Sequence, residues 1–228
     1  MLASFSYDRC LSGWRDHMRT RATIVTAMLL LVETGALQAQ RVEVQPFVGY
    51  RFGGGFDVGQ NTPEGTRPIA LNIESGFTWG GTVGVLFADV WEAEFMWSRQ
   101  DSALSAETIG FPKTTLFNMN VNQFQGNVLI HIADSDAKLI PYVVFGLGTT
   151  VFDPDVEGLG SLTKFSYGLG LGIKAYLTDH AGIRTQFRFT PTYIDTTPGI
   201  FCDLFCYVVD VADWTNQFEF TVGASLRF

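Results

Sequence analysis

Residues 165–177, FSYGLGLGIKAYL, decide how this chain folds. The odd positions carry Phe, Tyr, Leu, Leu, Ile, Ala and Leu, whereas the even positions carry Ser, Gly, Gly, Gly, Lys and Tyr. Successive side chains of a strand point to opposite faces, so this period of two predicts a strand with one apolar and one small or polar face. The run is longer than the usual strand of a globular protein, and it fits the length that a tilted strand needs to cross hydrocarbon.

The same alternation recurs from about residue 41 to the end of the chain. It predicts eight strands, with ten as the alternative count, over residues 42–53, 75–88, 90–101, 115–132, 138–151, 163–177, 181–194 and 213–228.

The fourth of these segments is irregular. Met119 and Val121 lie on one phase of the alternation, whereas Val128 lies on the other. A β-bulge near Asn122 and Gln123 would restore a single register, and we predict one there.

The connections alternate in length. Those at residues 88–89, 133–137 and 178–180 are short, and the others are longer and rich in Gly, Pro and acidic residues. Short turns at one end and long loops at the other are typical of membrane-spanning β-barrels, in which the short turns face the periplasm. The pattern therefore predicts an all-β protein that forms a single antiparallel up-and-down barrel.

The size of the side chains indicates which face of this barrel is apolar. A soluble ligand-binding barrel has the same period with its apolar face inward, but the interior of eight strands has room only for packed side chains. Glycines and charged residues such as Gly168, Gly170 and Lys174 fit that interior, whereas a dense face of Phe, Leu, Trp and Tyr does not. In water an outward apolar face of this size would be intolerable, so we predict a transmembrane barrel whose apolar face contacts lipid.

Charged residues of both signs occupy the inward phase. They can pair across the lumen, because an unpaired buried charge is costly, and we predict a filled lumen. This polar structural core is favoured over an ion path or gate. The predicted lumen network comprises Glu43, Arg51, Glu92, Glu94, Lys164, Lys174, Arg184, Arg188, Glu219 and Arg227.

Aromatic residues gather near both ends of the predicted strands. They are candidates for the two girdles that mark the membrane interfaces. Those nearer the long loops are Tyr50, Trp79, Trp97, Tyr193 and Trp214, and those nearer the short turns are Phe87, Trp91 and Phe228.

The first 39 residues have the order of a secretory signal peptide. An apolar run at 22–32 follows two arginines and precedes small residues, and it is too short to span a bilayer. Cleavage is expected after Ala36 or Ala39, which assigns residues 1–39 to the signal peptide and 40–228 to the barrel domain. Because the segment before Met18 is unlike a signal, we expect translation to begin at Met18.

Composition excludes several classes of function. The net charge of −8 and the lack of a basic run argue against a nucleic-acid partner. No cofactor or metal is expected, since the acidic loop with Asp153, Asp155 and Glu157 lacks the spacing and glycine of a calcium loop. His131 and His180 have no serine at a spacing that suits nucleophilic catalysis, so we expect no enzyme.

Cys202 and Cys206 lie four residues apart in the last long loop. An exported protein reaches a compartment that permits disulfides, so a bond between them is expected. It would display neighbouring apolar residues as a surface for adhesion or partner binding, although a loop folded back on the barrel rim is the favoured alternative.

The chain resembles the outer-membrane protein β-barrel family, the eight-stranded relatives of the OmpA transmembrane domain, OmpX and Ail. The resemblance rests on VQPFVGY at 44–50, PYVVFGLG at 141–148, GLGLG at 168–172 and the last strand, which ends on an aromatic residue. It implies a place in the cell outer membrane, contact with outer-membrane lipids, and insertion by the barrel-assembly machinery. It also implies that this machinery reads the last strand as an assembly signal, carried by Phe220, Val222, Leu226 and Phe228.

These observations predict an integral outer-membrane barrel with a structural or surface-interaction role. Its long loops would meet a surface ligand or host partner, and its polar lumen would be plugged. The alternatives are a narrow pore for ions or small solutes and, less favoured, a lipid-modifying enzyme. We expect the protein to be a monomer.

Overall fold

The computed structural model describes residues 41–62, 65–107, 113–134, 136–156, 158–194 and 213–228. Within these ranges there is no helix with the length and hydropathy of a membrane span. The strands are β1 (Arg41–Gly53), β2 (Gly55–Thr62), β3 (Gly65–Ile73), β4 (Gly76–Ala88), β5 (Trp91–Glu107), β6 (Thr114–His131), β7 (Leu139–Pro154), β8 (Leu162–Tyr176), β9 (Ala181–Ile194) and β10 (Asp213–Arg227).

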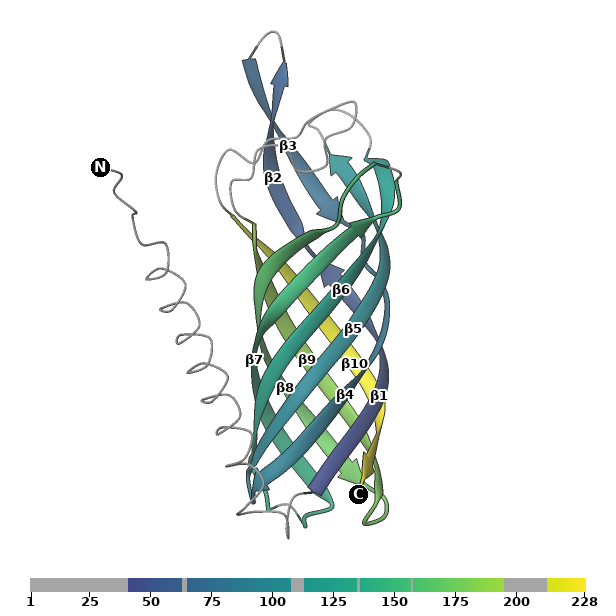
Figure 1. Cartoon of the computed structure of the whole chain (residues 1–228), viewed down its shortest axis with the longest axis vertical. Coiled ribbons are helices and arrows are strands. Elements are labelled where there is room, and N and C mark those ends of the chain that lie inside the picture. Colours follow the sequence, from purple (N-terminus) through teal and green to yellow (C-terminus); the bar gives the residue numbers. More distant parts are fainter. Residues whose placement is uncertain (1–40, 63–64, 108–112, 135, 157, 195–212) are drawn as a thin grey trace, which may run out of the picture. The chain divides into compact units, whose positions relative to one another are not determined.

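Eight of these strands close into one antiparallel barrel (Figure 1). Each pairs with its neighbours in the order β5-β4-β1-β10-β9-β8-β7-β6, and pairing of β6 with β5 completes the circle. The predicted fold and the count of eight barrel strands are confirmed. The first long connection additionally contains β2 and β3, a hairpin that joins the barrel by pairing β3 with β5 over residues 70–73.

The stagger of the strands follows from their pairing. A row of paired residues that starts at Arg51 passes through Glu219 and Arg188 and returns to β1 at Arg41, ten positions below its start. Such a stagger in an eight-stranded barrel tilts the strands by roughly 40°. Each residue then advances about 2.5 Å along the barrel axis, so an apolar band of roughly 25 Å takes about ten residues of a strand.

The outer face of the barrel is apolar. On β8, Phe165, Leu169 and Leu171 are exposed, Leu171 by 61%, whereas Ser166 and Lys174 on the opposite face are buried. The apolar face therefore points outward, as the sequence predicted, and contacts lipid. Aromatic pairs lie on this surface towards the long loops, with ring centroids 5.0 Å apart for Trp79–Trp97 and 5.1 Å apart for Tyr193–Trp214.

The predicted β-bulge near Asn122 and Gln123 is wrong. β6 pairs without a shift of register from Met119 to His131 on its β7 side, and its register with β5 shifts only between Leu104 and Ser105 of that strand. Met119 and Val121 are buried on the same inward phase as Gln123. The apolar residues change phase because the lumen itself becomes apolar at this level.

Buried apolar side chains close the lumen at the long-loop end. They come from β3, β5, β6, β7 and β9, and the hairpin contributes two of them. We call this cluster the apolar plug; its members are Leu71, Ile73, Leu104, Met119, Val121, Phe152 and Ile194.

Candidate functional site

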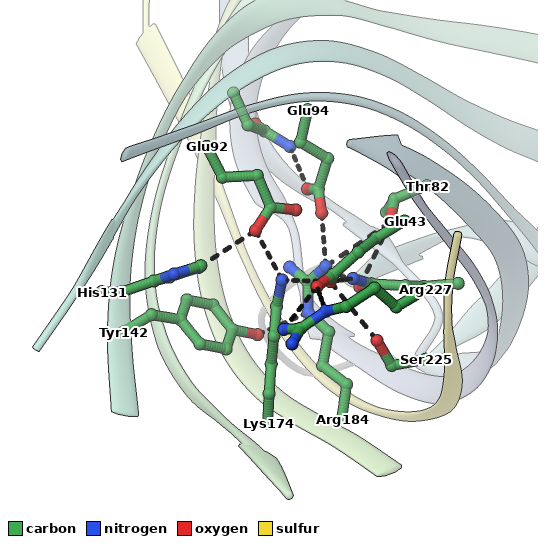
Figure 2. Close-up of polar contacts among 12 residues, drawn as sticks. Glu43, Thr82, Glu92, Glu94, His131, Tyr142, Lys174, Arg184, Ser225 and Arg227 are labelled. Carbon is green, nitrogen blue, oxygen red and sulfur yellow. Dashed lines mark hydrogen bonds and ion pairs between the residues drawn. The ribbon is translucent and has the colours of Figure 1, made fainter. Parts of the chain in front are cut away.

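Lys174 lies at the centre of the charged network nearest the short turns (Figure 2). Its ammonium group is fully buried, with Nζ 2.6 Å from Glu43 Oε2 and 2.5 Å from Glu92 Oε2. These three residues belong to β8, β1 and β5, which are not neighbours in the barrel. The ion pairs therefore join separate parts of the wall across the lumen.

Further side chains complete this short-turn layer. His131 Nε2 lies 3.0 Å from Glu92 Oε2, and the hydroxyl of Tyr176 donates to Glu43 Oε1 over 2.5 Å. Arg227 Nε donates to the same Glu43 oxygen over 2.9 Å, while its guanidinium lies 3.9 Å from the centre of the Tyr176 ring. Glu43 thus receives bonds from two strands besides its own, β8 and β10.

Arg184 organises a middle layer. Its guanidinium forms an ion pair with Glu94 and donates to Gln45 and Gln186. Arg184 Nε also donates over 2.5 Å to the hydroxyl of Tyr142, whose ring lies 4.9 Å from the guanidinium carbon. A planar cation with several donors suits this position, since one residue bridges four strands of the wall.

An upper layer lies between Arg184 and the apolar plug. Arg51 Nη2 is 3.0 Å from Glu219 Oε1 and donates to Ser98 over 2.6 Å. Arg188 Nη1 donates to the amide oxygens of Gln125 and Asn127. The order along β9, from Arg184 to Arg188, and along β6, from Gln125 to Met119, places this layer on the long-loop side of the middle layer.

The lumen is packed along its axis. A cavity beside Phe47 and Arg184 has room for no more than about one water molecule. At the short-turn mouth a cavity of about 490 Å³ ends against Tyr176 and Arg227. The charged layers therefore lie between an open mouth at one end and the apolar plug at the other.

The structure buries all ten side chains of the lumen network named from the sequence. It adds polar groups that sequence reasoning missed. Four of them share the inward phase of a strand with a named charge, whereas Gln123, His131 and Tyr142 lie on β6 and β7, which carry none of those charges. Tyr176 follows Lys174 by two positions, for example, which is a signal that the alternation could have provided. The added polar partners are Gln45, Gln123, His131, Tyr142, Tyr176, Gln186 and Gln217.

Other sequence predictions fall on different parts of the molecule. Phe220, Val222 and Leu226 lie on the outer face of β10, and Phe228 follows them with 75% of its side chain exposed. Cys202, Cys206 and the signal peptide lie outside the described residues.

The two histidines of the barrel have partners that are not serines. His131 contacts Glu92, and His180 Nδ1 lies 3.2 Å from the carbonyl oxygen of Arg227 in the turn between β8 and β9. In the part of the chain that the structure describes, no three His, Cys, Asp or Glu side chains gather as metal ligands would. Glu157 of the predicted acidic loop lies outside that part.

A closed antiparallel barrel with an apolar outer belt and a packed polar lumen is the architecture of an integral outer-membrane protein. The model of the family described as "Outer membrane protein beta-barrel domain" matches residues 25–228, so this chain belongs to that family. The protein is located in the outer membrane.

Solved outer-membrane barrels share this fold. OprG from Pseudomonas aeruginosa superposes with a TM-score of 0.64 at 13% identity, over 85% of this chain and 98% of OprG. Neisserial surface protein A superposes with a TM-score of 0.53 at 14% identity, over 83% and 97% of the two chains. The barrel AlkL, determined in lipid bilayers, gives 0.51 at 17% identity, over 86% and 93%. A search of curated protein sequences found no match.

Proposed function

We propose that this protein is a plugged barrel that works at the cell surface, through a structural or surface-interaction role of its long connections. The observation that carries the proposal is the packing of the lumen. Three polar layers cross it, the void beside Arg184 has room for no more than about one water molecule, and the apolar plug covers the upper layer. A lumen built in this way supports the wall more readily than it conducts.

The hairpin of β2 and β3 supports the second half of the proposal. Among the described residues, β3 pairs with the barrel through residues 70–73, and the rest of the two strands pair with each other. Figure 1 shows this ribbon above the rim. A strand pair beyond the membrane offers a surface to a ligand or host partner without disturbing the layers in the lumen.

Single-channel recording in planar bilayers tests the plugged lumen. We expect the purified barrel to give no stable openings. Stable unitary openings of the wild type that change in size in Arg184→Ala would contradict the proposal and favour a narrow pore. Arg99→Gln, which removes an exposed ion pair with Asp101 on the outer face, is the matched control.

Shortening the hairpin tests the surface role. A variant in which residues 56–69 are replaced by a two-residue turn should assemble to wild-type levels, because the described residues among them, 56–62 and 65–69, pair within the hairpin and not with the described barrel strands. Cells displaying either form are then compared for adherence to immobilised proteins and glycans. If cells with the shortened hairpin adhere as well as wild-type cells to every surface that retains wild-type cells, the hairpin has no part in the proposed role.

A further inference from the structure

In two layers of the lumen, the described ion pairs provide one carboxylate for each cation. In the third layer they do not. In the short-turn layer Lys174 and Arg227 face Glu43 and Glu92, and in the middle layer Arg184 faces Glu94. In the upper layer, two guanidinium groups share one carboxylate. Glu219 is paired in register with Arg51 on one side and with Arg188 on the other, and its carboxylate bonds to Arg51.

Arg188 therefore has only neutral acceptors. It is 1% exposed, and its Nη1 donates to the amide oxygens of Gln125 and Asn127. A buried charge normally has a counter-charge, because neutral dipoles compensate for lost hydration only in part. Arg188 thus forms no ion pair with a described carboxylate, and Glu94 and Glu219 attract it only without direct contact.

The unpartnered buried groups of the lumen include acceptors, such as Gln123 Oε1 and Ser166 Oγ, but most guanidinium nitrogens of this layer are also among them. Nε and Nη2 of Arg188, and Nε and Nη1 of Arg51, are buried and have no acceptor among the described atoms. The side-chain nitrogens of Gln125 and Gln217 are likewise without acceptors. Buried polar groups in proteins are almost always satisfied, so these unpartnered N–H groups indicate a further acceptor in this layer.

We propose that the upper layer binds one small monovalent anion, of the size of chloride or bromide, between the guanidinium groups of Arg188 and Arg51. A halide accepts several N–H bonds at once and supplies the single negative charge that the layer lacks. The same donors disfavour a cation. Water would accept the N–H bonds but would leave the positive charge of the layer uncompensated.

A glycine in the wall beside this layer lets two of its side chains lie against the backbone. Gly168 faces Arg188 Nη1 and Gln125 Oε1, which lie 2.8 and 2.6 Å from where its Cβ would be. Because the surrounding lumen is packed, the anion is captured as the barrel folds and is exchanged slowly afterwards.

Retention of bromide tests the site. The full barrel is refolded into lipid vesicles in sodium bromide, desalted into sodium gluconate, and its bromide is counted by mass spectrometry. We expect about one bromide per chain, because one positive charge is uncompensated. Arg99→Gln on the outer face should retain the same amount, and Arg188→Gln should lose it. A wild-type count equal to that of protein refolded without bromide overturns the proposal and leaves water as the occupant.

A second variant keeps the test decisive if Arg188→Gln does not fold. Glu219→Gln removes the carboxylate that competes with the anion, so bromide should leave this variant several times more slowly than it leaves the wild type. Faster release, or no retained bromide in either protein, contradicts the proposal.

Discussion

The ammonium of Lys174 lies 2.6 Å from the carboxylate of Glu43, although 131 positions separate the two residues in the sequence. The contact crosses from β8 to β1 inside the barrel, and both side chains are buried. It therefore exists only when all the intervening strands have closed in the correct register. The lumen network thus reports closure of the barrel as well as stabilising it.

Removing this ammonium should weaken the barrel strongly. Lys174→Met leaves Glu43 and Glu92 buried without their shared cation, and breaking a buried pair from one side costs about 3–5 kcal/mol. We expect a loss of this size in the free energy of unfolding, measured by urea titration in lipid vesicles. Arg99→Gln breaks the exposed pair with Asp101 and should cost less than about 1 kcal/mol. Equal effects of the two changes would contradict a structural role for Lys174.

A methyl group at Gly168 should disturb the upper layer. The added Cβ would lie 2.6 Å from Gln125 Oε1 and 2.8 Å from Arg188 Nη1, so both side chains must move. We expect Gly168→Ala to destabilise the barrel by roughly 1–3 kcal/mol, as overpacking commonly does. Gly126→Ala is the matched control, because its nearest neighbour is a carbonyl oxygen at 4.0 Å. Comparable stability of the two variants in urea unfolding would show that the layer is loosely packed.

The outer face of β6 locates one edge of the membrane. Its even positions change from Asn118, Asn120 and Asn122 to the apolar Phe124 and Val128. This switch along one strand places the hydrocarbon boundary near Phe124.

An arginine should therefore be costly within the belt and tolerated beyond it. Leu171→Arg puts a charge in the middle of the outer face of β8 and should cost roughly 2–4 kcal/mol in unfolding from lipid vesicles. Asn118→Arg, at an exposed position beyond the boundary, should cost roughly 0–1 kcal/mol. A similar cost at both positions would mean that the belt is placed wrongly on the strands.

The barrel strands were predictable because lipid outside and packed polar groups inside impose a strict period of two. The lumen charges followed from the same period. Their partners did not, since the neighbour of Arg184 across the lumen depends on a stagger of ten that no single strand encodes. Pairing of Arg184 with Glu94 could be seen only once the strands were assembled.

Two features escaped the sequence pattern for different reasons. The hairpin of β2 and β3 contains Pro68 and several glycines, and it lacks the alternation that marks the other strands. The apolar plug breaks the assumption that the inner face is polar throughout. Met119 and Val121 face inward because they pack against Leu71 and Ile73 of the hairpin, which the sequence did not reveal.

The pair Cys202 and Cys206 remains a prediction. An oxidising compartment and a separation of four residues favour a disulfide. We expect native protein, labelled with a thiol reagent without reductant, to show no free thiol at these positions, and to show two after reduction. Labelling of both cysteines in the unreduced protein would show that they do not form a disulfide.

Phe228 should matter for assembly more than for the stability of the finished barrel. Its ring is exposed, whereas its backbone N–H donates to the carbonyl of Val42 over 2.9 Å and its carbonyl accepts from Val42 N–H over 3.3 Å. Phe228→Ala keeps these backbone bonds and removes only the aromatic group that the family resemblance identifies as the assembly signal.

We therefore expect Phe228→Ala to lower the amount of barrel in the outer membrane several-fold in cells, while purified variant and wild type refold to similar extents in vesicles. Leu177→Ala is the control, because Leu177 is an equally exposed apolar residue at the same end of the barrel. Its level in the membrane should stay close to wild type, since its position is not part of the last strand. If Phe228→Ala reaches wild-type levels in the outer membrane, Phe228 is not part of an assembly signal. If both variants lose the same amount, the loss comes from removing apolar surface at this interface and not from a signal.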